Sequence, residues 1–442
     1  MRRIGMRVNW SHLGRGLRAM VAAGTLWAAW AGCQNTMDPQ VGELWQRQVG
    51  TAEDDSLYGV AVGAGSVYAA GATKGHLLDS PSAGALSDGL VIKSDLNGLV
   101  TWQRQFGTAG NEEWRAIAVD GGGNAYVVGY TDGTFAGQTR VGGDSDAVIA
   151  RIKPDGSLDW VRQFGTMGAD YLLGVTVDSA GAVYAVGWTS GTLPGQTLRG
   201  GSDGILVKYS ADGTQQLAQQ LGSAKDDLLN SVTSDGTGAL YIGGWATDVV
   251  EAGQTALGGR DGALYKWVPG TGVVWARQFS SGADDEVQAI GVAASGSPIY
   301  VTGRAAGGVG GQTALGRLDG FVASVDSGGA VRWTAQVGTM FDDDLRALLV
   351  DPTGGVYVAG YASLPLPNAM WAGGKDAAFF KLAVDGSQTW GFELGSSGDD
   401  QVLGLAAASG GGAFAVGTTT GTLKDQLALG KVDGFLGRYQ LK

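Results

Sequence analysis

The sequence predicts an all-β protein, a seven-bladed β-propeller of four-stranded antiparallel blades, closed by pairing of an N-terminal strand with the C-terminal blade. Three observations lead to this prediction. A segment of nearly constant length recurs seven times, each copy holds four candidate strands, and the two chain ends carry complementary incomplete sheets. The 79 glycines among 442 residues recur at fixed places between short apolar runs, as turns between strands do.

The repeat is clearest at "WQRQFGTAGNEEWRAIAVD", from Trp102, which the next copy repeats as "WVRQFGTMGADYLLGVTVD", from Trp160. The anchors of the seven copies are Trp45, Trp102, Trp160, Leu217, Trp275, Trp333 and Trp390. The spacing between consecutive anchors hardly drifts along the chain. So constant a period, about 58 residues, predicts one supersecondary unit per copy.

The copy that begins at Trp160 shows the four candidate strands of one unit. They are "WVRQFG", "LLGVTVD" from Leu172, "AVYAVGWT" from Ala182 and "DGILVKYS" from Asp203. β-branched and aromatic residues alternate in them, and no stretch keeps a 3.6-residue apolar face, which argues against helices. An Asp-Gly turn at Asp212-Gly213 then leads into the next Trp strand, as in a β-hairpin.

The chain ends distinguish a closed propeller from an open β-solenoid. A lone Trp strand, residues 44 to 50, precedes the first full copy, and the chain stops after an Asp strand that starts at Asp433. The last sheet therefore lacks one strand, which the N-terminal strand supplies if the ring closes. Closure also removes sheet edges that would otherwise invite aggregation. The terminal copies lack the atypical polar caps that a solenoid needs.

The first residues predict export and a lipid anchor. Five arginines and no acid precede an apolar run over residues 19–32, which spans about 21 Å, too short for the roughly 30 Å hydrocarbon core. The run ends in "WAGC" with the only cysteine, Cys33, and resembles the bacterial lipoprotein signal. We expect residues 1–32 to be a signal peptide, 33–43 a tether and 44–442 the propeller. The alternative is an ordinary signal peptide with a chance cysteine.

Export through the inner membrane and lipidation of Cys33 would place the protein at the cell envelope, expected at the outer membrane, as a monomer. Loss of the five arginines takes the formal charge from −12 to −17. Nucleic-acid binding needs clustered Lys and Arg, and no such cluster follows residue 18. We therefore expect no nucleic-acid partner.

The stretch "GVTVDSAGAVYAVGWTSGTLPGQTLRGGSDGILVKYSADG", from Gly174, resembles the bacterial β-propeller repeat family SBBP. The likeness covers residues 44–442 and implies an extracytoplasmic propeller, in a family whose members mostly lack an assigned reaction. Two copies depart from the pattern, between Gly75 and Asp88 and between Ser363 and Asp376, and lack the "GQT" that begins at Gly137, Gly195, Gly253 and Gly311 in four other copies. We expect these two loops to differ in shape.

The Trp anchors should lie on the outermost strand of each blade. Burial of such a ring between neighbouring sheets contributes roughly 2–3 kcal/mol. A carbohydrate-stacking role is the alternative. Leu217 in the same column favours packing, because leucine fills a wedge but stacks poorly on a sugar.

Ten residues beyond each anchor the chain has an acid, and in a propeller this loop borders the mouth of the central channel. The seven acids are Asp55, Glu112, Asp170, Asp227, Asp285, Asp343 and Asp400. They are the candidate binding residues, because an acidic rim would attract cations or basic partner segments. The alternative, which we favour, is that each accepts hydrogen bonds from backbone amides of its own loop.

A further aspartate opens the fourth strand of every copy and suggests a turn device. These residues are Asp88, Asp146, Asp203, Asp261, Asp319, Asp376 and Asp433. Six copies have a cation five positions later, which raises the question of ion pairs between blades. Dense "DxDxDG" loops are absent, so calcium is not expected.

Catalytic residues and cofactors are not expected. His76 is the only histidine after the predicted cleavage point, and no metal-ligand or triad spacing surrounds it. The turn from Asp155 to Trp160 compares with the sialidase Asp box, but its glycine spacing is nearer the Trp-docking turn of quinoprotein propellers. Both likenesses concern blade packing.

We therefore predict a non-catalytic binding scaffold, held at the envelope by its lipid, whose partner is an unidentified protein or polysaccharide. The rival class is an enzyme, carbohydrate-active or quinone-dependent, for which the irregular copies one and six are the places to look. A third alternative is an accessory lipoprotein of outer-membrane protein assembly, which only fold analogy supports.

Overall fold

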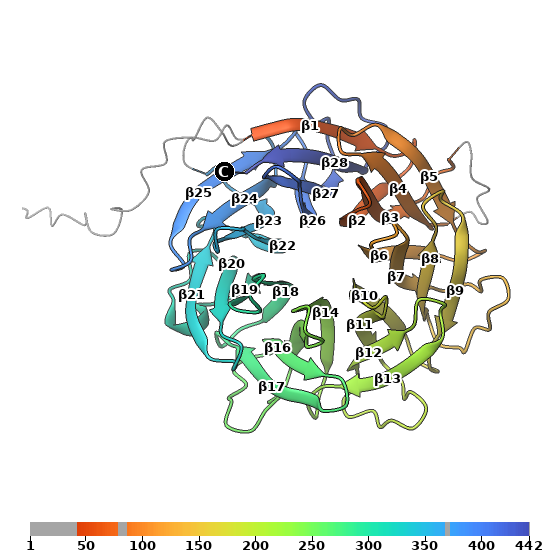
Figure 1. Cartoon of the computed structure of the whole chain (residues 1–442). Coiled ribbons are helices and arrows are strands. Elements are labelled where there is room, and N and C mark those ends of the chain that lie inside the picture. The colour runs from red at the N-terminus through yellow and green to blue at the C-terminus, as the bar shows by residue number, and fades with distance from the viewer. Residues whose placement is uncertain (1–41, 78–85, 367–371, 442) are drawn as a thin grey trace, which may run out of the picture. The chain divides into compact units, whose positions relative to one another are not determined.

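The computed structural model describes residues 42–77, 86–366 and 372–441, which form a closed ring of seven four-stranded antiparallel blades (Figure 1). The innermost strands are β2 (Asp55–Gly63), β6 (Glu112–Val119), β10 (Asp170–Val177), β14 (Asp227–Ser234), β18 (Asp285–Val292), β22 (Asp344–Val350) and β26 (Asp400–Ala407). The second strands are β3 (Ser66–Thr73), β7 (Ala125–Thr131), β11 (Val183–Thr189), β15 (Leu240–Ala246), β19 (Ile299–Ala305), β23 (Val356–Ala362) and β27 (Ala413–Thr419).

The third strands are β4 (Asp88–Asp95), β8 (Asp146–Ile152), β12 (Asp203–Tyr209), β16 (Asp261–Val268), β20 (Asp319–Val325), β24 (Asp376–Leu382) and β28 (Asp433–Gln440). The outermost strands are β5 (Val100–Phe106), β9 (Leu158–Phe164), β13 (Gln215–Leu221), β17 (Gly272–Phe279), β21 (Val331–Val337), β25 (Gln388–Leu394) and β1 (Gly42–Val49). One short 3₁₀ turn, η1 (Val309–Gly311), lies before β20. No helix in the described part of the chain is long and apolar enough to cross a membrane.

The ring closes through the predicted clasp. Strand β1 pairs antiparallel with β28, from Gly42 opposite Gln440 to Val49 opposite Gly434, so the last blade has the order β1-β28-β27-β26. β1 begins two residues before the predicted start at Leu44. The fold prediction is thus confirmed, including the number of blades and the source of the borrowed strand.

The apolar core is divided into seven clusters, each between two neighbouring blades. One cluster, for example, joins Tyr68 and Trp102 of the first full blade to Trp114 and Val127 of the next. In this arrangement each blade is stabilised by both neighbours and not by an interior of its own. The second and third strands are buried almost without interruption, as β7 and β8 show, because both faces of each blade are covered.

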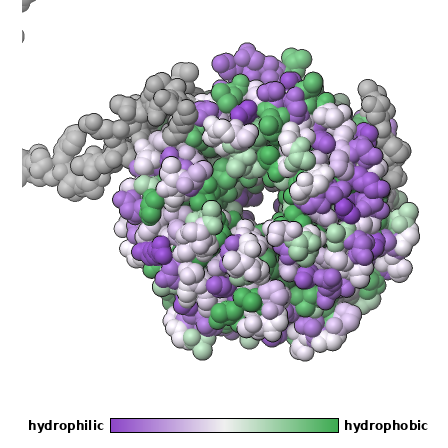
Figure 2. Space-filling view, in the orientation of Figure 1, coloured by the Kyte–Doolittle hydropathy of each residue, from purple (hydrophilic) through white to green (hydrophobic). Residues whose placement is uncertain are grey.

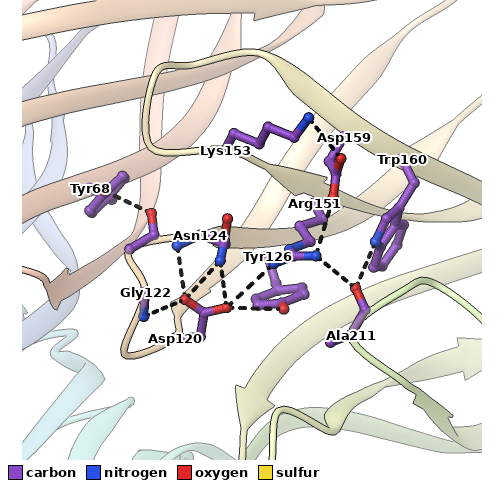
Figure 3. A network of polar contacts seen from close by, with 11 residues as sticks. Tyr68, Asp120, Gly122, Asn124, Tyr126, Arg151, Lys153, Asp159, Trp160 and Ala211 are labelled. Carbon is purple, nitrogen blue, oxygen red and sulfur yellow. Dashed lines mark hydrogen bonds and ion pairs between the residues drawn. The ribbon is translucent and has the colours of Figure 1, made fainter.

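The contacts between neighbouring blades are called joints below. The Trp anchors form part of these joints, as predicted from packing (Figure 3). Trp160 donates from Nε1 to the carbonyl oxygen of Ala211, 3.0 Å away in the Asp-Gly turn of the next blade. A Cβ atom placed on Gly213 of that turn would lie 2.7 Å from the Trp160 ring, and the backbone there has φ of +81°. The turn therefore needs glycine both for its backbone conformation and for the approach of the indole.

Cations of the third strand bind the same carbonyl groups. Arg151 donates to the Ala211 carbonyl at 3.1 Å and lies over the Tyr126 ring, with its ion-pair partners Asp120 and Asp159 in its own blade (Figure 3). Lys93 and Lys266 likewise donate to a carbonyl of the following blade. The joints suggested as ion pairs between blades are, at these positions, hydrogen bonds to backbone carbonyls.

The aspartates expected at the start of the fourth strand of each copy open the third strand of each blade, when the strands are counted outward from the channel. They are turn devices, as their repetition suggested. Asp146 accepts from the backbone N–H of Val141 at 3.0 Å and from Nε2 of Gln163 on the outermost strand at 2.9 Å. Oε1 of Gln163 accepts from the N–H of Phe135, which fixes the loop between the second and third strands. In the closing blade, Gln48 of β1 makes the same contacts with Asp433 and Leu423.

Candidate functional site

The seven candidate rim acids are buried, and the structure corrects the idea of an exposed acidic rim. Each is at most 1% exposed. Each accepts a hydrogen bond from the backbone N–H of the residue four positions earlier, as Asp170 does from Thr166 at 2.6 Å. The equivalent donors for Asp55, Glu112, Asp227, Asp285, Asp343 and Asp400 are Thr51, Thr108, Ser223, Ser281, Thr339 and Ser396. The acids therefore fix the loops that enter the innermost strands.

Burial also weakens the negative charge of these acids. Desolvation raises the pKa of Asp227 and of Asp285 to about 7 and that of Asp343 to about 6, while hydrogen bonds from the loops oppose the rise. The pKa of Asp170 is raised for the same reason. Enclosed carboxyls whose ionisation is opposed by burial do not form a surface that attracts cations.

The innermost strands enclose a central channel of about 230 Å³, and Figure 2 shows its opening at the centre of the ring, bordered in part by hydrophobic residues. Every innermost strand contributes three consecutive residues to the channel wall, such as Arg115, Ala116 and Ile117 from β6. The first of the three lies at a break in strand register, since Trp114 pairs with Gly129 while Ala116 pairs with Val128. This bulge occurs in all seven innermost strands.

Three positions near the channel mouth differ from blade to blade, although their neighbours do not. The residue one position after the buried acid is Ser56, Glu113, Tyr171, Leu228, Glu286, Asp344 or Gln401. The bulged residue two positions further on is Tyr58, Arg115, Leu173, Asn230, Gln288, Arg346 or Leu403. The second-strand residue paired with the first set is Ala72, Tyr130, Trp188, Trp245, Arg304, Tyr361 or Thr418. We call these three sets together the channel mouth.

The intervening position is apolar in every blade, and it is Leu57, Trp114, Leu172, Leu229, Val287, Leu345 or Val402. All seven side chains are buried. The repeats therefore keep their packing residues and vary the residues that border the opening.

Aromatic side chains and the ion pair of Arg115 with Glu113 occupy one sector of the channel mouth. The Tyr130 and Tyr171 rings, from adjacent blades, lie 4.5 Å apart between centroids, and Trp188 stacks on Tyr171 at 4.8 Å with an interplanar angle of 10°. Arg115 pairs with Glu113 at 3.0 Å and lies 4.1 Å over the Tyr58 ring. This sector spans three blades and links them through side chains.

Charged side chains occupy the neighbouring sector. Glu286 Oε1 accepts from Arg260 at 2.9 Å and from Arg304 at 2.8 Å, and Asp344 pairs with Arg346 at 2.8 Å. Burial opposes the charge of Arg304, but its bond to Glu286 raises the Arg304 pKa. Burial and the nearby Asp344 carboxylate raise the pKa of Tyr361 to about 12. These groups form a fixed network and not a set of mobile surface charges.

The remaining sequence-derived candidates do not join this site. His76 is exposed in the loop after β3. Cys33, the predicted signal peptide and the tether up to residue 41 lie outside the described residues, and so do residues 78–85 and 367–371 of the two irregular loops. Among the residues that are described, no group of three or more His, Cys, Asp or Glu side chains could hold a metal ion.

The channel mouth was not predicted from the sequence, because the candidate residues were chosen for being the same in every copy and those of the channel mouth differ between copies. The signal was present in the alignment of the seven copies, where two columns of the innermost strand change chemistry beside columns that do not. A residue that is the same in all seven blades meets a need common to seven blades. A binding partner of a closed ring without sevenfold symmetry needs differences between them.

The fold and the channel mouth define this protein as a β-propeller whose blades share one skeleton and differ around a central opening. Residues 101–136 and 159–194 match the model of the beta-propeller repeat SBBP, so the chain carries SBBP repeats, as the sequence suggested. It is also 24% identical over 377 residues to the Regulatory protein FlaEY of Caulobacter vibrioides. That match covers 80% of this chain and 35% of the relative, so the chain spans about a third of the relative's length.

Two solved structures are similar to this chain at low sequence identity. A chain in the crystal structure of a mitotic checkpoint complex is 12% identical, with a TM-score of 0.52, over 96% of this chain and 99% of that chain. A Dyadobacter fermentans protein of unknown function is 11% identical, with a TM-score of 0.46, over 91% of this chain and all of that one. At 12% identity, the likeness to the chain of the mitotic checkpoint complex shows the propeller fold alone.

Proposed function

We propose that the protein is a non-catalytic binding scaffold of the bacterial cell envelope, anchored by a lipid on Cys33, whose channel mouth contacts the partner. One observation carries the proposal: every innermost strand keeps a buried apolar residue just before its bulge, but the bulged residue, which lines the channel in every blade, differs from blade to blade. The likeness to a protein named as regulatory is compatible with a binding role.

A protein that binds without catalysis needs a rigid frame and a distinctive surface. The frame is supplied by the clasp between β1 and β28 and by the joints between blades. The distinctive surface is supplied by rings and charges held in place by one another, such as Tyr171 on Trp188. Preorganised side chains lose little conformational freedom when a partner binds.

Matched leucine variants test the contact surface. Leu228 lies at the channel mouth, whereas Leu99 is 67% exposed in the turn before β5. We expect Leu228→Glu in the full-length chain to abolish co-purification of the partner from cross-linked cells, and Leu99→Glu to retain it. Equal co-purification by both variants would place the contact elsewhere.

Replacing Cys33 tests the anchor separately. We expect Cys33→Ser to move the protein from the membrane fraction to the soluble fraction and to abolish incorporation of a labelled fatty acid. Incorporation at an unchanged level in the variant would contradict lipidation at this residue.

A further inference from the structure

Loop glutamines cap the free edge of the outermost strand in four blades. This edge faces away from the blade, and no other strand pairs with it. Gln254, for example, accepts from the backbone N–H of Gln278 at 2.9 Å and donates to the carbonyl oxygen of Ala276, also at 2.9 Å. The other three pairs are Gln138 with Gln163, Gln196 with Gln220 and Gln426 with Gln48. An edge whose backbone groups are bonded in this way is protected from pairing with a strand of another chain.

The edge of β21 is not capped, although its loop has the equivalent glutamine, Gln312. Gln336 of β21 pairs with β20 in the register in which Gln278 pairs with β16, so its N–H also points away from the blade. No described residue bonds to this N–H, and Gln312 is exposed. Thr334, two residues earlier, is partly exposed, whereas Ala276 at the same position of β17 is 1% exposed. This edge therefore presents open backbone groups.

The amide of Gln336 shows the same change in the loop. In the neighbouring blade, Oε1 of Gln278 accepts from the N–H of Val250, which holds the loop to the strand. Oε1 of Gln336 is buried without a hydrogen-bond partner, while its Nε2 still donates to Asp319. The loop before β20 has thus moved out of the arrangement that caps the other edges.

Gly310 accounts for the different loop. It has φ of +64° within η1, whereas Ala136, Pro194 and Ala252 at the equivalent position have no positive φ. Residues with a side chain seldom adopt this conformation. A Cβ atom on Gly310 would also lie 2.3 Å from Oγ1 of Thr334. Glycine at position 310 therefore permits the loop conformation that leaves the edge open.

A cavity of about 570 Å³ lies beside the open edge. It is formed where the end of β17 meets the start of β21, which are the outermost strands of neighbouring blades (Figure 1). Phe279, Val309 and Trp333 line it together with Ser280 and Gln312. Its volume lies in the range of about 300–1,000 Å³ that is usual for ligand pockets. The cavity can take an apolar side chain from a segment that lies along β21.

The Trp333 ring is more open than the anchors that pack best. Trp275 is 7% exposed, and the guanidinium of Arg277, two residues later, lies over its ring. Ala335 stands two residues after Trp333, and the Trp333 ring is partly exposed. Trp333 thus adds apolar surface next to the open edge.

We propose that β21 binds an extended segment of a partner polypeptide as a fifth strand of its blade, with an apolar side chain of that segment in the adjoining cavity. The open groups identify the occupant. Backbone N–H groups that recur at every second residue, about 7 Å apart, match the backbone of another strand. This contact is separate from the channel mouth and does not depend on the proposed function.

A random dodecapeptide display library, selected on the full-length chain, supplies the probe. We expect the enriched peptides to be rich in β-branched and aromatic residues, which favour an extended backbone. Each peptide is then synthesised with N-methyl groups at alternate residues, in both possible frames. One frame should lose about tenfold or more in affinity, because it removes the N–H groups that face β21, and the other should lose much less. Equal affinities of the two frames would overturn the strand pairing.

Gly310→Ala tests whether the edge of β21 is the site. Alanine restores the residue of the capped blades and strains the open loop, so Gln312 should cap Gln336. We expect the peptides to lose about tenfold or more in affinity, while the thermal unfolding midpoint stays the same or rises. Ala136→Gly is the matched control, because it exchanges the same two residues in another blade. It should change the affinity by less than about twofold.

Thr334→Pro tests the edge without relying on the loop. The N–H of Thr334 points away from β20, as that of Ala276 points away from β16, so proline removes a donor of the open edge and no bond within the blade. It should weaken peptide binding as Gly310→Ala does. Undiminished binding by both variants would overturn the inference.

Two other results would assign the edge differently and would also overturn it. Concentration-dependent dimerisation of the wild type that Gly310→Ala abolishes would make a second copy of this chain the occupant. A neutral oligosaccharide that binds the wild type and not Gly310→Ala, with no peptide enriched, would make the ligand a sugar. Leu228→Glu should bind the selected peptides as the wild type does, so a failure at β21 is distinguishable from a failure at the channel mouth.

Discussion

Replacing Glu393 with glutamine is expected to stabilise the propeller above pH 7 and to change it little in mild acid. Six blades place glutamine at this position of the outermost strand, and the amide of Gln163, for example, donates to Asp146. The sixth copy has Glu393, which keeps the bond from the Leu366 N–H at 3.0 Å but brings a carboxyl towards Asp376. Glu393 Oε2 is buried without a hydrogen-bond partner.

The expected magnitude follows from the titration of Glu393. Burial, with the charges of Asp376 and Asp343, raises its pKa from 4.5 to about 7. The folded state thus holds the proton more tightly than the unfolded state, so stability falls as the pH rises from about 4.5 to about 7. The full shift corresponds to about 3 kcal/mol, which partial exposure of the side chain reduces to about 2 kcal/mol. At pH 5 the same reasoning gives about 0.5 kcal/mol.

Urea denaturation followed by tryptophan fluorescence at pH 5 and pH 8 measures this difference. Glu393→Gln should gain about 1.5 kcal/mol more at pH 8 than at pH 5. Gln163→Glu is the reciprocal control, and it should lose stability at pH 8 more than at pH 5. A gain for Glu393→Gln that is the same at both pH values would refute the reasoning, because it would owe nothing to ionisation.

Three further predictions concern the joints and the clasp. Trp160→Ala should lower the free energy of unfolding by about 3–5 kcal/mol and Trp160→Leu by clearly less, since Leu217 occupies the same column in another blade; urea denaturation measures both. Gly213→Ala should cost more than Gly236→Ala, because both glycines have positive φ but only at Gly213 would the new Cβ meet the Trp160 ring; equal losses would contradict the proposed joint. Gln48→Ala, which removes bonds to Asp433, Gly421 and Leu423, should cost about 2–3 kcal/mol and increase self-association on size-exclusion chromatography as the clasp opens.

The fold could be predicted from the sequence because its causes are local and repeated. The constant period, the Asp-Gly turns and the alternation within strands specify a blade seven times over. The strand over residues 44 to 50 and the missing last strand specify the closure. The Trp column was placed correctly for the same reason, since a large ring that recurs on the outermost strand of six of the seven copies is best buried between neighbouring blades.

The site could not be predicted in the same way, because its contacts join residues from different blades. Tyr130 and Tyr171 belong to different copies, and nothing in either copy shows that their rings meet. The orientation of Arg346 towards the channel depends on a bulge that sequence alone does not reveal. The repeated acids such as Asp170 looked functional because they are charged, yet burial makes them part of the loop structure.

Site-specific photo-cross-linking in cells tests most directly whether the channel mouth is the contact surface. A photoreactive amino acid would replace Leu173 or Leu228 at the mouth, and Leu99 or Leu158 on the periphery of the ring. We predict one discrete cross-linked product, of the same mass, from each mouth position and none from the peripheral positions. The same product from Leu99 or Leu158, with none from the mouth, would contradict the account.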